Sequence, residues 1–178
     1  MDDPRRAGHR GPLCSGTAWA AMPSRHGCDV RSKVVGELSR RGWELSEAKD
    51  LQGSLACHHE ATSSPNSGPL NWFHRARSEQ AFGRLHEALD SFKRALDPGA
   101  SYALPAREAQ EAWFQLAKLQ RDAGILEDAA ASYRRVVEMS PQLPSAHIML
   151  AVVLHELGRT AESVDAYTIG LTLDPSVG

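Results

Sequence analysis

The sequence predicts an all-α fold in which three helical hairpins stack into a solenoid, preceded by a largely irregular N-terminal arm. The main observation is an internal repeat, in which AWFQLA at 112–117 matches AHIMLA at 146–151. The same spacing relates Gly124 to Gly158, Tyr133 to Tyr167 and Pro141 to Pro175. A constant period of about 34 residues is typical of stacked hairpins, because a single hairpin cannot bury its apolar face alone.

Glycine and proline positions define the expected helix boundaries. Gly124 and Gly158 each follow an apolar periodic run, as glycines at helix C-termini do. Pro105 and Pro144 stand where new helices begin. We therefore expect six helices in residues 69–178, with Trp72 and Trp113 largely buried. The expected boundaries lie near Gly83, Pro105, Gly124, Pro144 and Gly158.

The repeated residues resemble the tetratricopeptide repeat family, whose pattern is Trp-x2-Leu-Gly-x2-Tyr, then Ala-x3-Phe, then Pro within each repeat. The second and third copies carry the pattern at Trp113, Leu116, Ala117, Gln120, Ala129, Tyr133 and Pro141, and at His147, Leu150, Ala151, Leu154, Ser163, Tyr167 and Pro175. A first copy carries it at Trp72, Gly83, Ala88, Phe92 and Pro98. The resemblance covers about residues 69–178 and implies hairpins over about 69–98, 110–143 and 144–177. An ordinary helical bundle with chance spacing is the alternative.

The first copy departs from the pattern in two ways. Arg75 and Glu79 stand at positions that are usually apolar in the family. The separation of Trp72 from Trp113 also exceeds one period by seven positions. The extra segment, 99–105, falls between two hairpins, where an insertion costs little free energy.

Residues 1–68 form the expected irregular arm, with one possible helix over about 34–51. Gly36 and Gly42 weaken that helix. The segment 60–69 has the composition of a linker. An alternative is a divergent fourth repeat over 34–66, in which Ser54 and His58 would take the small and the aromatic positions.

Composition and charge narrow the classes of partner. The net charge of −2 argues against nucleic acid, because no global basic field is present. No apolar run reaches the length of a transmembrane helix, so a membrane is not an expected partner. The segment 13–22 is too short and too polar for a good secretory signal. The compartment stays undetermined, with the cytoplasm favoured.

Motifs for catalysis or metal binding are absent from the sequence. The cysteines at 14, 28 and 57 lie near histidines, but no Cys-x2-Cys pair of the kind that binds zinc occurs. The sequence contains no Gly-x-Ser-x-Gly, phosphate loop or His-Glu-x-x-His. His155 and Glu156 are helix neighbours that point about 100° apart, a poor geometry for an acid/base pair. We therefore expect no enzyme activity, cofactor or metal.

Function must then reside in the groove that a tetratricopeptide-like stack presents. In this family the first helix of each hairpin lines the concave face. Projecting that pattern onto this sequence gives the candidate groove residues Phe73, Arg77, Phe114, Gln115, Lys118, Arg121, Ile148, Met149, Val152 and His155. Phe73, Phe114 and Ile148 would form an apolar row beside the cations Arg77, Lys118 and Arg121. Such a surface suits an amphipathic or acidic-aromatic peptide or helix. The alternative is that Phe114 and Ile148 are packing residues.

These features predict a non-catalytic scaffold for protein–protein interaction. A repeat portion of a larger modifying enzyme, with its catalytic domain outside this chain, is the second hypothesis, and RNA binding is a weaker third. Some family members bind the C-terminal carboxylate of chaperones with Lys, Asn and Arg side chains. The matching positions here are Phe73, Arg77, Gln115, Ser145 and Met149. Only Arg77 among them has the charge that a carboxylate requires, so such a clamp is rejected. No polar capping helix follows the last repeat, which predicts self-association through the helix at 160–173.

Overall fold

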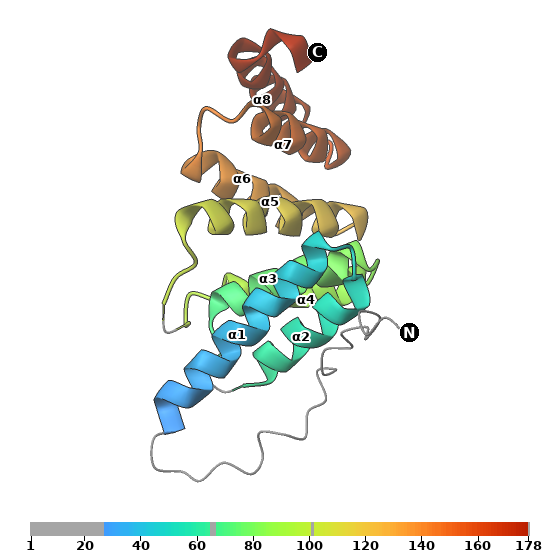
Figure 1. Cartoon of the computed structure of the whole chain (residues 1–178). Coiled ribbons are helices and arrows are strands. Elements are labelled where there is room, and N and C mark those ends of the chain that lie inside the picture. The colour runs from blue at the N-terminus through green and yellow to red at the C-terminus, as the bar shows by residue number, and fades with distance from the viewer. Residues whose placement is uncertain (1–26, 65–66, 101, 178) are drawn as a thin grey trace, which may run out of the picture.

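The computed structural model describes residues 27–64, 67–100 and 102–177, and these form a stack of helical hairpins (Figure 1). The helices are α1 Gly27–Glu47, α2 Leu51–Ser63, α3 Pro69–Ala81, α4 Leu85–Ala95, α5 Ala106–Asp122, α6 Leu126–Met139, α7 Pro144–Glu156 and α8 Thr160–Leu173, followed by a 3-10 turn, η1, at Pro175–Val177. Consecutive helices pair into four antiparallel hairpins, and each hairpin packs on the next one in sequence order. The described residues contain no strand, and the predicted all-α hairpin solenoid is confirmed.

The same turn joins the two helices of every hairpin. In the last three hairpins its central residue is a glycine with a positive φ, of 81° at Gly83, 76° at Gly124 and 75° at Gly158. The next backbone N–H donates to a carbonyl earlier in the first helix, as from Arg84 to Glu79 at 2.8 Å. This is the Schellman arrangement, which satisfies carbonyls that the end of the first helix leaves free.

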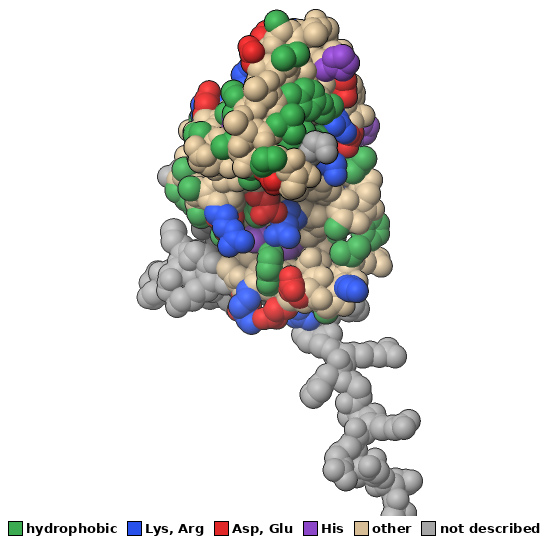
Figure 2. Space-filling view, turned by 90° about the horizontal axis from the view of Figure 1, so that it is seen from above, with side chains coloured by type: hydrophobic (Ala, Val, Ile, Leu, Met, Phe, Trp, Pro, Cys, Tyr) green, Lys and Arg blue, Asp and Glu red, His purple; other side chains and the backbone are tan. Residues whose placement is uncertain are grey.

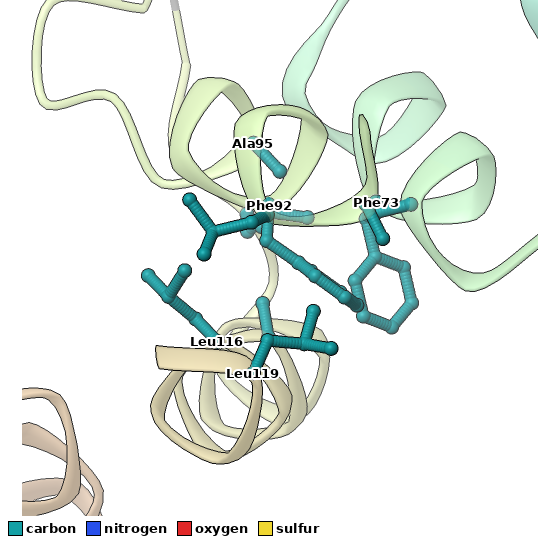
Figure 3. Packing of buried hydrophobic residues seen from close by; sticks show 10 residues of the cluster. Phe73, Phe92, Ala95, Leu116 and Leu119 are labelled. Atoms are coloured by element: carbon teal, nitrogen blue, oxygen red, sulfur yellow. The ribbon is translucent and has the colours of Figure 1, made fainter. Parts of the chain in front are cut away.

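The core between the second and third hairpins is aromatic and aliphatic (Figure 3). Phe73 of α3 and Phe92 of α4 meet edge to face, with ring centroids 6.2 Å apart. Leu116 and Leu119 of α5 point toward them from the following hairpin. Since all four side chains are buried, the junction stabilises the stack through loss of apolar surface from water.

The two tryptophans at the start of these hairpins are half-buried rather than largely buried. Trp72 and Trp113 pack against the edge of this core. The guanidinium groups of Arg94 and Arg75 lie over the Trp72 ring, 4.6 Å and 5.2 Å from its centroid. The stacked cations leave part of the indole near the surface, which explains its incomplete burial.

Arg75 and Glu79, the two charged residues that replace usually apolar ones in the first copy, form a buried polar network. Glu79 is 2% exposed and accepts hydrogen bonds from Arg75 at 2.7 Å and from Ser91 at 2.6 Å. Arg75 also donates to the Thr62 hydroxyl at 3.0 Å, which ties α3 to α2. The carboxylate is tolerated inside the stack because these partners satisfy it.

The N-terminal region differs from the expectation of one helix over 34–51. Two helices are present, and α1 and α2 form a hairpin in the same repeat register, as the alternative of a fourth repeat over 34–66 required. Gly42 lies inside α1 and does not end it. Its lack of a side chain leaves room for the His58 ring of α2. An added Cβ at Gly42 would lie 2.6 Å from a ring carbon of His58. The expected linker at 60–69 overlaps the ends of α2 and α3, and residues 1–26 lie outside the described residues.

Candidate peptide-binding groove

In the first three hairpins the first helices lie along the inner face of the stack. Helix α1 contacts α3 and α3 contacts α5, whereas the second helices have no comparable contacts with one another among the described residues. Because the first helices approach one another more closely, the curve of the stack closes on their side. The candidate groove residues predicted from the sequence all belong to α3, α5 and α7.

The apolar row expected across three hairpins is not an open surface. Phe73 is 1% exposed and belongs to the core, so it is unavailable to a ligand. Phe114 is half-buried and meets the Tyr133 ring edge to face, with centroids 5.5 Å apart. Ile148 is half-buried against α8, where its Cγ1 lies 2.8 Å from the position of a Cβ at Gly170. The packing alternative therefore describes Phe114 and Ile148 in part. The prediction of Phe73 as a groove residue is wrong, because its ring is buried against Phe92.

Arg77 is exposed but already has partners. Its guanidinium lies over the Trp43 ring at 5.3 Å and over the Phe73 ring at 5.8 Å. Its Nε is 3.5 Å from an oxygen of Glu111 on α5. A ligand that uses Arg77 must therefore compete with Glu111, or bind beside an intact ion pair.

Lys118 and Arg121 differ in how they are held. Lys118 is exposed, and none of the described residues forms an ion pair with it. Arg121 is half-buried and lies 3.4 Å from the carboxylate of Asp122. Lys118 is thus the cation in this part of the groove that is available to an acidic ligand.

Gln115 has a structural role in the groove. Its side-chain oxygen accepts a hydrogen bond of 3.0 Å from Gln80, which links α3 to α5 across two hairpins. On α7, Met149 and Val152 are half-buried and His155 is exposed. These three residues give the C-terminal part of the groove an apolar floor with a polar end.

A shallow pocket of about 310 Å³ lies between the N-terminal parts of α5 and α7. Its lining consists of Arg107, Gln110, Glu111, Phe114, Leu143 and Ser145. The exposed edge of Phe114 is therefore accessible from this side. In the space-filling view, Lys/Arg, Asp/Glu and His side chains gather around a hollow in the middle of the visible face (Figure 2).

Trp43 extends the inner face into the first hairpin, which the sequence reasoning missed. Trp43 stands one repeat before Arg77, and its ring meets His74 edge to face at 5.6 Å. His74 also stacks on His58, with centroids 5.6 Å apart and ring planes at 17°. The signal that could have identified Trp43 is its register with Arg77, which is hard to recognise because residues 1–68 show no clear periodicity.

Burial sets the protonation of the two stacked histidines. Burial, and to a smaller extent the neighbouring His74, lower the pKa of His58 to about 4. The pKa of His74 is also lowered, first by burial and then by Arg77, while Glu108 acts in the opposite direction. Both rings are therefore neutral at pH 7, and they contribute shape rather than charge to this end of the groove.

The described residues offer neither a metal site nor a membrane-spanning helix. Within these ranges, no group of three or more His, Cys, Asp or Glu side chains is arranged to hold a metal ion. Over the same residues, no helix combines the length and the apolar character needed to cross a membrane.

Comparison with known proteins assigns the fold to a family. A tetratricopeptide repeat family model matches residues 73–144 and 114–177. No curated protein sequence matches the chain. Among solved structures, the chain is similar to MamA, with 12% identity and a TM-score of 0.69 over 83% of this chain and 82% of that one. It is also similar to the first TPR of Spaghetti (RPAP3) bound to the HSP90 peptide SRMEEVD, with 17% identity and a TM-score of 0.61 over 71% and 95%.

A third similar structure is the Arabidopsis OM64 TPR domain, with 13% identity and a TM-score of 0.59 over 71% of this chain and 98% of that one. At these identities the solved structures support the fold alone. The family model covers more than half of the chain, and it matches the segment in which the repeat register, the positive-φ glycines and the stacked hairpins occur. The chain belongs to the tetratricopeptide repeat family.

Proposed function

We propose that this protein is a non-catalytic scaffold that binds an acidic, amphipathic peptide or helix in the groove lined by the first helices of its hairpins. The observation that carries the proposal is the exposed Lys118, which has no ion-pair partner among the described residues. The equivalent position in the next hairpin is occupied by Val152, which is apolar and half-buried. A cation beside a partly exposed apolar floor is complementary to an amphipathic segment with acidic residues along one edge.

The proposed ligand is not the C-terminal carboxylate of a chaperone. One solved relative of the same fold is bound to an HSP90 peptide. In the present chain, Arg77 is the one cation at the positions of a carboxylate clamp, and it is already paired with Glu111. Gln115, at another of these positions, is engaged by Gln80. The side chains that would hold a terminal carboxylate are therefore missing or in use.

The groove is best tested through its cations rather than through Phe114. Phe114 contacts the buried Tyr133, so a truncation there would confuse loss of binding with loss of stability. Lys118→Glu combined with Arg121→Glu changes the charge of the groove at positions outside the two core clusters. The control is Arg134→Glu with Arg135→Glu, which makes the same charge change on α6 and also removes the ion pairs of these arginines with Glu162 and Glu138.

Binding is measured by fluorescence anisotropy with labelled amphipathic helical peptides whose polar edge is acidic or basic. We expect the acidic peptide to bind and the basic one not to bind. The groove variant should weaken binding of the acidic peptide by about tenfold or more, because a charge-assisted hydrogen bond contributes about 1.5–3 kcal/mol. The control should bind like the parent protein. Equal weakening in both variants, or a preference for the basic peptide, would place binding outside this groove.

A further inference from the structure

A second candidate surface arises where the second hairpin meets the third. Helix α4 (Leu85–Ala95) has 11 residues, whereas the equivalent helix α6 (Leu126–Met139) has 14. When the two helices are aligned at Leu85 and Leu126, where they begin, Pro98 stands where α6 has Met139. Proline lacks an N–H and its ring would clash with the carbonyl of Arg94 in the preceding turn. Helix α4 therefore ends one turn early.

The missing turn coincides with a space beside the following helix, where Trp113 is half-buried and Leu116 is 3% exposed. A hollow of about 400 Å³ lies between the end of α4 and the outer side of α5. Its lining consists of Lys93, Arg94, Leu96, Asp97, Pro98, Trp113, Leu116 and Gln120. In the third hairpin α6 continues for one more turn, and its Val137 packs against the core as the equivalent Leu96 does here. The two helix ends differ at the next two positions, which are Asp97 and Pro98 here and Glu138 and Met139 in α6. The hollow thus lies beside the end of the shortened helix α4.

The connection after α4 lines the hollow with its first residues, Leu96, Asp97 and Pro98. It extends to Ala106 and carries the extra segment 99–105, and it runs along the side of the stack (Figure 1). At the next junction a shorter connection is fixed to α7, because His147 Nε2 lies 2.9 Å from the Pro141 carbonyl. Trp113 is the equivalent of His147, and no hydrogen bond joins its indole to the described part of the longer connection.

A second hollow of about 370 Å³ lies on the other side of the same helix end. Its lining consists of Ser67, Pro69, Trp72, Arg94, Asp97 and Ala100, so the two hollows share Arg94 and Asp97. The guanidinium of Arg94 is stacked over Trp72 at 4.6 Å, which fixes its position between the two hollows. A stacked guanidinium keeps its N–H groups free to bind a carboxylate.

The charges at the rim indicate the chemistry of a ligand. Lys93 and Arg94 are exposed, and no ion pair engages them among the residues that the structure describes. The carboxylate of Asp97 accepts a hydrogen bond of 2.9 Å from the Gly99 backbone, which occupies one of its oxygens. With two cations and one carboxylate the rim has a net positive charge, around a floor formed by the half-buried Trp113 and the nearly buried Leu116.

We propose that this junction is a second binding site, for a short extended peptide in which one large apolar side chain is flanked by acidic residues. The apolar side chain enters the larger hollow over Trp113 and Leu116, and a neighbouring carboxylate binds Arg94 and Lys93. The site is separate from the groove. Because successive helix residues are rotated by about 100°, Trp113 and Leu116 lie on the opposite side of α5 from Lys118.

The first test reverses the rim charges. The probe is a fluorescein-labelled peptide with a central phenylalanine flanked on each side by two aspartates, together with versions that carry flanking lysines or a central serine. Lys93→Glu with Arg94→Glu should weaken anisotropy-detected binding of the acidic phenylalanine peptide by about tenfold or more. Arg134→Glu with Arg135→Glu makes the same change at the equivalent positions of α6 and should leave binding within about twofold.

The second test fills the hollow and keeps both cations. Asp97→Glu with Pro98→Met copies the residues that end α6, so helix α4 should gain a turn and circular dichroism should show higher helicity. This variant should lose the binding of the acidic phenylalanine peptide. The proposal is overturned if no peptide binds, if the filled variant still binds, or if Lys118→Glu weakens binding as much as the rim reversal does. The last result would place the peptide in the groove instead.

Discussion

Lys49 and Gly83 stand one repeat apart and occupy the same turn, with φ angles of 61° and 81°. Each is followed by the hydrogen bond that closes the turn, from Asp50 N to Leu45 O at 2.9 Å and from Arg84 N to Glu79 O at 2.8 Å. Lys49 is the one residue other than glycine with a positive φ among the described residues. The backbone geometry of the repeat is thus retained in the first hairpin, although its sequence signature is lost.

The turn at Lys49 predicts that Lys49→Gly stabilises the protein. A side chain in the left-handed region costs about 1–2 kcal/mol, and glycine avoids that cost while it adds some entropy to the unfolded chain. We expect a net gain of about 0.5–1 kcal/mol in the free energy of unfolding, measured by urea denaturation. Gly124→Ala, in the equivalent turn of the third hairpin, should lose about 1 kcal/mol. A loss of stability in Lys49→Gly would contradict the strained conformation.

The comparison of Lys49 with Gly83 also explains how far the fold could be predicted. The last three hairpins were predictable because glycines, prolines and aromatic residues recur in register. The first hairpin replaces the turn glycine with Lys49 and the aromatic residue with His58, so its periodicity is hidden in the sequence. Its presence depends on packing that no local pattern reveals, such as the His58 ring lying directly against Gly42.

Tyr133 gives a second prediction, that its hydroxyl can be removed without loss of stability. The side chain is 0% exposed and its hydroxyl has no hydrogen-bond partner in the described structure. Burial raises the pKa of Tyr133 to about 12, as expected for a phenol deprived of water. Phe92 occupies the equivalent position in the second hairpin. Tyr133→Phe should therefore keep or raise the melting temperature, because an unsatisfied buried polar group costs about 1–3 kcal/mol.

The control for this prediction is Tyr133→Leu, which removes the hydroxyl and also the ring that packs against Phe114. It should destabilise the protein by about 1–3 kcal/mol through loss of packing. If Tyr133→Phe proves as harmful as Tyr133→Leu in thermal unfolding, the hydroxyl has a partner, such as a buried water, and is satisfied.

The stacked histidines predict a pH dependence of stability. His58 has an ordinary pKa of 6.5 when unfolded and a pKa of about 4 in the folded protein, because burial disfavours the imidazolium ion. The unfolded state therefore binds the proton first as the pH falls, and stability decreases between pH 6.5 and about pH 4. At about 1.4 kcal/mol for each tenfold change in proton affinity, the full loss is about 3 kcal/mol.

His58→Phe separates this effect from the titration of carboxylates. Phenylalanine matches Phe92 at the equivalent position and cannot titrate. Unfolding by urea at several pH values between 4 and 7 should show a shallower loss of stability in the variant than in the parent protein. Parallel curves for the two proteins would mean that the pKa of His58 is the same in the folded and unfolded states, so that the folded protein accommodates the imidazolium ion.

The groove was less predictable than the fold. The family register placed Lys118, Met149 and Val152 on the inner face, where side chains are at least partly accessible. It could not show that Phe73 turns into the core toward Phe92. Whether a side chain at a groove position faces a ligand or the next helix depends on the size of its neighbours, and that requires three-dimensional packing.

The final prediction is that the chain self-associates through its last helix, α8. Tyr167 and Tyr133 are equivalent residues of successive repeats, but Tyr133 is 0% exposed and Tyr167 is 36% exposed. Helix α7 follows α6 and packs on it, whereas among the described residues no hairpin packs on the outer face of α8. Val164, Ile169 and Leu171 on the same helix are also exposed. An apolar patch of this kind favours association.

Tyr167→Glu with Leu171→Glu should shift the purified 178-residue chain toward monomer, because charges in the patch resist desolvation. The matched control is Thr168→Glu with Thr172→Glu, which adds the same charges at the exposed positions that follow them on α8. Sedimentation velocity over a series of concentrations provides the measurement. The parent protein and the control should sediment faster as concentration rises, and the patch variant should not. A parent protein that stays monomeric throughout would show that this face of α8 is protected in solution.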